Sequence, residues 1–196
     1  MNYNRIKNMA LLDSGATDPV TGDPITLFTS AQKPVTVVGG DLTVTYKLTP
    51  NLEATVAGEH FKYRFSEPGT LAFARPDRRA YLTLAMDSGP WDVFVRGTWT
   101  GPQDLKKFYY RDTQHYNFDG SAKPDKSRAF WTFDARVQYA IDKRWAVFAG
   151  ADNLFDFRQS DHDGYLWVDA SGKIDVTHIW GPNRGRFVYG GIRFEI

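Results

Sequence analysis

The chain has 196 residues, with 24 Lys and Arg against 23 Asp and Glu and no cysteine. This balance of charge argues against a nucleic-acid partner, and the absence of cysteine excludes disulfide bonds and thiolate metal sites. Aromatic residues make up 15% of the chain, yet the mean hydropathy is −0.45. Apolar residues that alternate with polar ones would produce this combination.

Period-two alternation runs through the chain in order and predicts β-strands. In residues 130–141, for example, Trp131 and Phe133 fall on one face while Thr132 and Asp134 fall on the other. The expected strands cover residues 34–48, 52–65, 79–86, 91–99, 130–141, 144–151 and 185–196. Residues 2–11 are a candidate for the tail of an eighth strand, and the rest of 1–33 is expected to be an outside loop.

The connections between these strands are of two kinds. Tight turns are expected at 49–51, 87–90 and 142–143, and long connections at about 66–77, 101–127 and 156–184. The two kinds alternate strictly, which is typical of a transmembrane β-barrel with short periplasmic turns and long extracellular loops. The expected fold is therefore all-β, an antiparallel transmembrane β-barrel segment of about seven to eight strands within a larger barrel.

The lengths and faces of the strands agree with a bilayer. No apolar run approaches the ~20 residues of a membrane helix, whereas most strands reach the about 9–11 residues that a tilted strand needs. The apolar faces are expected to contact lipid, and the polar faces water or a plug. We expect the following charged residues to face inward, as wall residues or in contact with a plug rather than with a ligand: Asp134, Arg136, Arg193 and Glu195. Aromatic residues near strand ends match interfacial girdles, namely Trp91, Trp99, Trp131, Tyr139 and Trp145.

The stretch ADNLFDFRQS, residues 151–160, breaks the alternation where a strand should end. We expect the side chains of Asn153 and Asp156 to cap backbone N–H groups there. Leu154 and Phe155 are expected to pack at the outer interface or against the neighbouring strand. These four residues are therefore interpreted as a structural landmark rather than a binding site.

In this context residues 129–196 resemble the C-terminal end of TonB-dependent outer-membrane receptors. The matching elements are the penultimate hairpin, the motif Asn153-Leu154-Phe155-Asp156, the Gly185–Arg186 pair and a terminal amphipathic strand. Residues 37–65 are similar to the family's glycine-then-strand-pair pattern. The apolar face of the terminal strand, which the barrel-assembly machinery would read, is formed by Val188, Ile192, Phe194 and Ile196. Barrels of this family usually end in an aromatic residue, whereas the last residue here is Ile196.

The resemblance implies that residues 1–196 are the C-terminal part of a barrel of about 22 strands with a plugged lumen. It implies import of a scarce nutrient, of the siderophore-iron, cobalamin or glycan class, across the outer membrane of a Gram-negative bacterium. The implied partners are outer-membrane lipid, the barrel-assembly machinery, and a plug and the TonB complex, which act through regions missing from this chain. The N-terminus has no signal peptide, so we expect a cytosolic chain or one that begins within a longer protein.

Candidate ligand contacts lie in the connection 101–127, where Tyr and Arg favour recognition. They are Tyr109, Tyr110, Arg111, His115 and Tyr116. The alternative, which we favour, is a strand that extends above the membrane with its own interface aromatics. The stretch 162–178 holds two His and three Asp without compact ligand spacing, so a solvated loop is expected rather than a metal site. No nucleophile–base arrangement is visible, so we expect no catalytic residue, no cofactor and no enzyme.

From the sequence alone, two other interpretations of the chain remain open. One is a small self-contained outer-membrane barrel with a structural or adhesion role, which would use residues 1–10 as its eighth strand. The other is a soluble lipocalin-like binder of small molecules.

Overall fold

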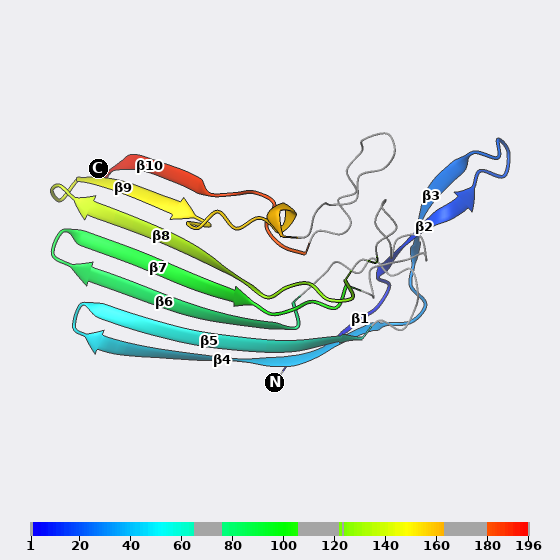
Figure 1. Cartoon of the computed structure of the whole chain (residues 1–196), viewed down its shortest axis with the longest axis horizontal. Helices are drawn as coiled ribbons and strands as arrows, with labels where there is room; N and C mark the ends of the chain where they lie inside the picture. Colours follow the sequence, from blue (N-terminus) through cyan, green and yellow to red (C-terminus); the bar gives the residue numbers. More distant parts are fainter. Residues whose placement is uncertain (1, 65–75, 106–121, 123, 163–179, 196) are drawn as a thin grey trace.

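The computed structural model describes residues 2–64, 76–105, 122, 124–162 and 180–195 (Figure 1). Within them, eight strands form one antiparallel sheet in the order β1-β4-β5-β6-β7-β8-β9-β10, and β2 pairs with β3 in a separate hairpin. The strands are β1 (Asn2–Ile6), β2 (Ala10–Thr17), β3 (Pro24–Ser30), β4 (Val35–Thr49), β5 (Leu52–Arg64), β6 (Arg78–Ser88), β7 (Trp91–Thr100), β8 (Phe130–Ala140), β9 (Trp145–Asp152) and β10 (Phe187–Phe194). The 3-10 helix η3 covers Gln159–Asp161, and none of the helices in this part of the chain is long and apolar enough to cross a bilayer.

The strands predicted from alternation are confirmed, with ends that differ by a few residues. The candidate eighth strand is also confirmed, because β1 pairs with β4 from Asn2↔Gly39 to Ile6↔Val35. The sheet is one layer, and its tight turns lie at one end together with the C-terminus (Figure 1). The β2–β3 hairpin extends from the other end, which we call the loop end (Figure 1).

Residues 1–33, where we expected an outside loop, contain the β2–β3 hairpin, which the sequence analysis did not predict. The pairing shifts register between Asp13 and Ala16, and this irregularity removes the alternation that would have revealed β2. The turn itself has a local cause. The Asp18 carboxylate accepts hydrogen bonds from the N–H groups of Val20 at 2.7 Å and Thr21 at 3.2 Å. Gly22 then takes a φ of 74°, which costs glycine little.

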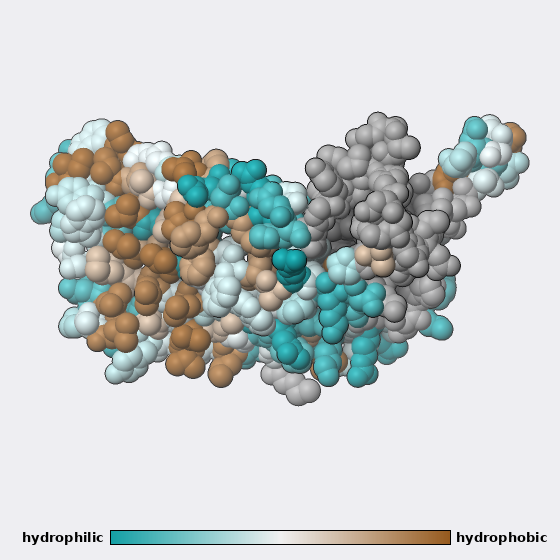
Figure 2. Space-filling model, viewed as in Figure 1, coloured by the Kyte–Doolittle hydropathy of each residue, from teal (hydrophilic) through white to brown (hydrophobic). Residues whose placement is uncertain are grey.

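The two faces of the sheet differ in chemistry. Directly paired residues share a face, so the pairing identifies, strand by strand, the residues that lie on the same face as Leu42. Most of this outer face is apolar, and its exposed members include Leu42, Val44, Tyr46, Val56, Leu82, Val95, Trp131, Val188 and Ile192. Figure 2 shows these hydrophobic side chains gathered over the strands toward the tight turns, with hydrophilic ones toward the loop end. The predicted girdle residues all belong to this face.

The strands have almost no apolar core of their own. The buried apolar cluster in the described part of the chain lies at the loop end and contains Leu105, Phe130 and Trp180, with Phe157 packed against it. We call these four residues the loop-base cluster. Its rings are in close contact: the rings of Phe130 and Phe157 are nearly parallel, and their centroids are 4.6 Å apart. Side-chain packing is therefore concentrated where the long connections leave the sheet.

Aromatic side chains lie over glycines of the neighbouring strand. Phe133 covers Gly97 and Tyr189 covers Gly150, and each aromatic residue is the direct cross-strand partner of its glycine. A Cβ atom at Gly97 would lie 2.9 Å from the Phe133 ring, and one at Gly150 would lie 2.5 Å from the Tyr189 ring. Such pairs fix the register of adjacent strands, because only glycine leaves room for the ring.

We predict that Gly39→Ala weakens the β4–β5 pairing by about 1–3 kcal/mol, as overpacking does. The new methyl group would overlap the His60 carbonyl and lie 2.8 Å from the Phe61 Cα, and backbone atoms cannot rotate away. The measurement is the folded fraction, read from electrophoretic mobility without boiling and from protease resistance. Gly58→Ala is the matched control, because its Cβ would meet only the Arg79 carbonyl at 4.0 Å. Equal stability of the two variants would contradict this account.

Candidate functional site

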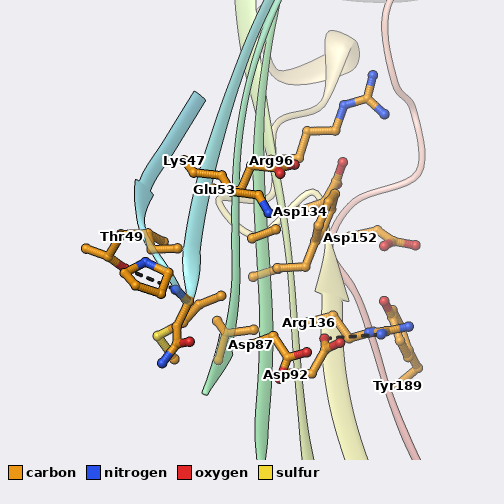
Figure 3. Close-up of a pocket in the computed structure, with 18 residues that line it drawn as sticks. Lys47, Thr49, Glu53, Asp87, Asp92, Arg96, Asp134, Arg136, Asp152 and Tyr189 are labelled. Carbon is orange, nitrogen blue, oxygen red and sulfur yellow. Dashed lines mark hydrogen bonds and ion pairs between the residues drawn. The ribbon is translucent and has the colours of Figure 1, made fainter. Parts of the chain in front are cut away.

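The inner face of the sheet carries a hollow of about 680 Å³ toward the tight turns (Figure 3). Its charged lining comes from β4 to β9 and contains five acidic and three basic side chains. These are Glu53, Asp87, Asp92, Asp134 and Asp152 with Lys47, Arg96 and Arg136. The hollow is thus a mixed-charge surface with an acidic excess, and it lies on the face opposite the apolar one.

The ion pair between Arg136 and Asp92 in this hollow is exposed to solvent. The Arg136 guanidinium lies 3.3 Å from the Asp92 carboxylate, and these side chains are 45% and 49% exposed. Exposed pairs contribute roughly 0–1 kcal/mol because water screens them. The predicted inward positions of Asp134 and Arg136 agree with the register, and Arg193 pairs with Glu195 on the same face. These charged side chains are thus about half exposed on the inner face.

A second group of inward side chains surrounds Tyr81, a residue that sequence reasoning did not single out. The Arg96 guanidinium lies 4.5 Å from the centre of the Tyr81 ring and that of Arg79 lies 5.7 Å away. Arg79 also pairs with Glu59 across β5 and β6. The Nε atom of Arg96 is buried and has no hydrogen-bond partner among the described residues. The only signal in the sequence was the alternation of β6, which places Tyr81 on the face opposite to that of Leu82.

Asn153 makes four hydrogen bonds through its side chain and backbone N–H where β9 ends. Its side-chain oxygen accepts from the Phe157 N–H at 3.0 Å, and its amide nitrogen donates to the carbonyls of Phe157 at 2.7 Å and Arg184 at 3.3 Å. Its own N–H donates to the Asp134 carboxylate at 2.9 Å. Asn153 has a φ of 51°, in the left-handed region that Asn tolerates better than most residues.

Asp156 makes a second set of contacts that reaches the start of β10. Its carboxylate accepts from the Arg186 N–H at 2.6 Å and pairs with Arg158 at 3.1 Å. Gly185 permits this approach, because a Cβ there would overlap atoms of Asp156 and Arg158. The hydrogen bond from the Arg186 N–H is the main cause that lowers the pKa of Asp156 below its ordinary value of 3.8; desolvation opposes it, and Arg158 adds to the lowering. We call Asn153 and Asp156 the clasp residues.

The apolar residues around the clasp go to opposite faces. Phe155 is 69% exposed and meets Phe133 of the outer face edge-on, with ring centroids 5.1 Å apart. The N–H of Leu154 donates to the Phe133 carbonyl at 2.6 Å. Phe157 instead belongs to the loop-base cluster. The segment therefore closes over the end of β8 and contacts both sides of the sheet.

Two buried glutamines, which the sequence analysis also did not identify, join the connections at the loop end. Gln103, next to β7, donates from Nε2 to the Trp180 carbonyl at 2.7 Å. The side-chain oxygen of Gln159 accepts from the N–H groups of Trp180 at 2.8 Å and Gly181 at 2.9 Å. The connection between β7 and β8 is thereby fastened to the connection between β9 and β10.

Other predicted residues have a simpler outcome. Val188, Ile192 and Phe194 lie on the outer face of β10, while Ile196 lies outside the described residues. The candidate ligand contacts Tyr109, Tyr110, Arg111, His115 and Tyr116 also lie outside them. In the residues that are described, no group of three or more His, Asp or Glu is arranged to hold a metal ion.

We predict that Asn153→Ala lowers the folded fraction more than Asn153→Gly does. Both variants lose the side-chain hydrogen bonds, which leaves a partly buried Phe157 N–H unsatisfied at a cost of about 1–3 kcal/mol. Only alanine adds strain at a φ of 51°. Electrophoretic mobility without boiling measures both effects. If both variants match the native protein, the clasp does not stabilise the sheet.

A pH prediction follows from Asp156. Because its folded pKa is lowered, its contribution to stability is fully present above 3.8 and is lost as pH falls through the folded value. The variant Asp156→Asn lacks this contribution at every pH. The difference in unfolding midpoint between native protein and variant should therefore be constant from pH 7 to about 5 and shrink below 3.8. A difference that grows on acidification would contradict the assignment.

Comparisons with known proteins agree with this geometry. Residues 3–154 match a family model described as TonB dependent receptor-like, beta-barrel, whereas no curated protein matches significantly. The copper transporter OprC is 20% identical, with a TM-score of 0.61 over 98% of this chain and 27% of that one. The ferric enterobactin receptor PfeA in complex with BCV-L6 is 20% identical, with a TM-score of 0.63 over 98% of this chain and 28% of that one.

The siderophore receptor PirA from Pseudomonas aeruginosa is 14% identical, with a TM-score of 0.56 over 98% of this chain and 25% of that one. At these identities the similarity shows the fold, and the chain spans 25–28% of the length of these three solved chains. The family model covers residues 3–154, from the first strand of the sheet into the clasp. The chain therefore belongs to the TonB-dependent receptor β-barrel family.

Proposed function

We propose that residues 1–196 form the C-terminal part of the barrel wall of an outer-membrane receptor that imports a scarce nutrient into a Gram-negative bacterium. The observation that carries this proposal is that one curved sheet has an exposed apolar face and, on its opposite side, a charged face with a hollow. The first face suits lipid, and the second suits an aqueous or plugged lumen.

The placement in a membrane is supported by side-chain exposure. Leu42 is 70% exposed, and Val188 and Ile192 at the far edge are 67% and 68% exposed. A contiguous apolar surface of this extent is costly in water, because each buried Å² of apolar surface is worth about 25 cal/mol. Lipid removes that cost. A soluble lipocalin-like binder would instead hide its apolar face.

The open edges of the sheet favour a larger barrel over a small self-contained one. In the described residues β1 and β10 are the two edges and do not pair with each other. A barrel of eight strands would require that pairing, because an open edge cannot be satisfied in hydrocarbon. Additional strands between these edges would close the wall, in agreement with the share of the solved chains that this chain spans.

The substrate is proposed as a class. OprC is named a copper transporter, PfeA a ferric enterobactin receptor and PirA a siderophore receptor. For this chain the candidates remain siderophore-bound iron, cobalamin and glycans. Tyr109, Tyr110, Arg111, His115 and Tyr116 stay a prediction for ligand contact. We assign the chain no catalytic residue.

The proposed partners follow from the two faces and the two ends. A plug domain would meet the charged hollow, and the TonB complex would act through that plug rather than through this chain. The outer face would meet lipid. The barrel-assembly machinery would read the terminal strand through Val188, Ile192, Phe194 and Ile196.

The proposal predicts that deleting the complete reading frame abolishes accumulation of one of the three labelled nutrient classes. Deleting the gene for TonB should abolish accumulation of the same class, because import would require its energy. Uptake of radiolabelled siderophore iron, cobalamin and glycan by intact cells measures this, with expression of the intact gene from a plasmid as the control. Uptake that persists without TonB would contradict the proposal.

A further inference from the structure

The outer face of the sheet sorts its charges by sign and by position. Among the described strand residues that the register places on this face, none is Asp or Glu. The charged residues among them are four cations at the loop end of β1, β5 and β6, namely Arg5, Lys62, Arg64 and Arg78. We call these four residues the cationic band.

The cationic band is compact. Thr36 of β4 is paired with Arg5 on one side and Arg64 on the other, so the two arginines flank one residue. Lys62 is two positions from Arg64 on the same face of β5, and Arg78 is the partner of His60 next along that face. Paired residues have Cα atoms about 4.5–5.5 Å apart, so these positive charges lie on adjacent patches of one surface.

The band is exposed and has no carboxylate partner among the described residues. All four side chains belong to exposed positions. The nearby acids point to the inner face, where Glu59 pairs with Arg79 and Asp41 accepts a hydrogen bond from Asn2. Among the described residues, no acidic side chain therefore relieves the repulsion between these four like charges.

The band continues the apolar surface. β4 and β5 have 15 and 13 residues, more than the about 9–11 that cross the hydrocarbon. Leu42, Val44 and Val56 occupy the same face toward the tight turns. Figure 2 shows this change from hydrophobic to hydrophilic along the face. A strand that spans the bilayer thus places the band at the level of the outer headgroups.

We propose that the cationic band binds outer-leaflet lipid whose phosphate headgroup carries a net negative charge. Guanidinium and ammonium groups donate several hydrogen bonds to phosphate, and the adjoining apolar face holds the acyl chains of the same lipid. Tyr3 is the partner of Val38, whose other partner is Lys62, and it adds an exposed interfacial ring to the site. This inference rests on the proposed placement in the membrane and adds a lipid specificity to it.

The test uses the receptor produced from its complete reading frame and reconstituted in phosphatidylcholine. Spin-labelled phosphatidic acid and spin-labelled phosphatidylcholine are added separately, and electron spin resonance gives the motionally restricted fraction of each. The native receptor should prefer phosphatidic acid. The double variant Lys62→Gln/Arg64→Gln should reduce that preference by up to about thirtyfold, because each of the two basic residues near an anionic surface adds to binding.

The matched control is Lys47→Gln/Arg193→Gln, which removes one lysine and one arginine from the inner face, away from lipid. It should keep the native preference, and mobility without boiling verifies that all variants are folded. Equal loss in both variants, or a native receptor that restricts both lipids equally, would overturn the inference and leave the barrel intact. A receptor that restricts neither lipid would instead refute the membrane placement, and with it the proposed function.

Discussion

In the proposed membrane placement, every strand of this sheet depends on its neighbours for backbone hydrogen bonds, because hydrocarbon offers none. Pairing runs without interruption from β1 to β10, so the face of one residue determines the face of all its cross-strand partners. A slip of one residue in any pair would turn a row such as Leu42 and Val44 inward and bring charged residues into lipid. Register is therefore the constraint on which the apolar face, the hollow and the cationic band all depend.

The register is held by different means at the two ends. At the tight turns, local contacts suffice, as when the Asp142 carboxylate accepts from the N–H groups of Arg144 at 2.7 Å and Trp145 at 2.9 Å. At the loop end the connections are long, and closing a long connection costs more chain entropy than closing a tight turn. The clasp residues, the two buried glutamines and the loop-base cluster lie there. A wall without a core thus obtains its side-chain packing where its connections are least constrained.

The sequence alone predicted the wall well because alternation is a local signal that a bilayer enforces on both faces. The family motif also predicted where β9 ends, at Asn153, whose φ of 51° lies in the left-handed region. Features that depend on cross-strand neighbours were not predictable. The Tyr189 ring over Gly150 and the Gln103 contact with Trp180 join residues 39 and 77 positions apart. The β2–β3 hairpin was missed for the opposite reason, since its irregular pairing removed the local signal.

The distribution of charge separates stability from function in this wall. Inner-face pairs such as Arg136 and Asp92 are about half exposed, so water screens them and they add little to folding. If a plug meets this face, as proposed, these pairs can rearrange at little cost to the strands. On the outer face a carboxylate would face either hydrocarbon or headgroup phosphate, and both oppose negative charge, whereas long basic side chains extend into the headgroup layer. The absence of Asp and Glu from the outer strand positions that the structure describes follows from that asymmetry.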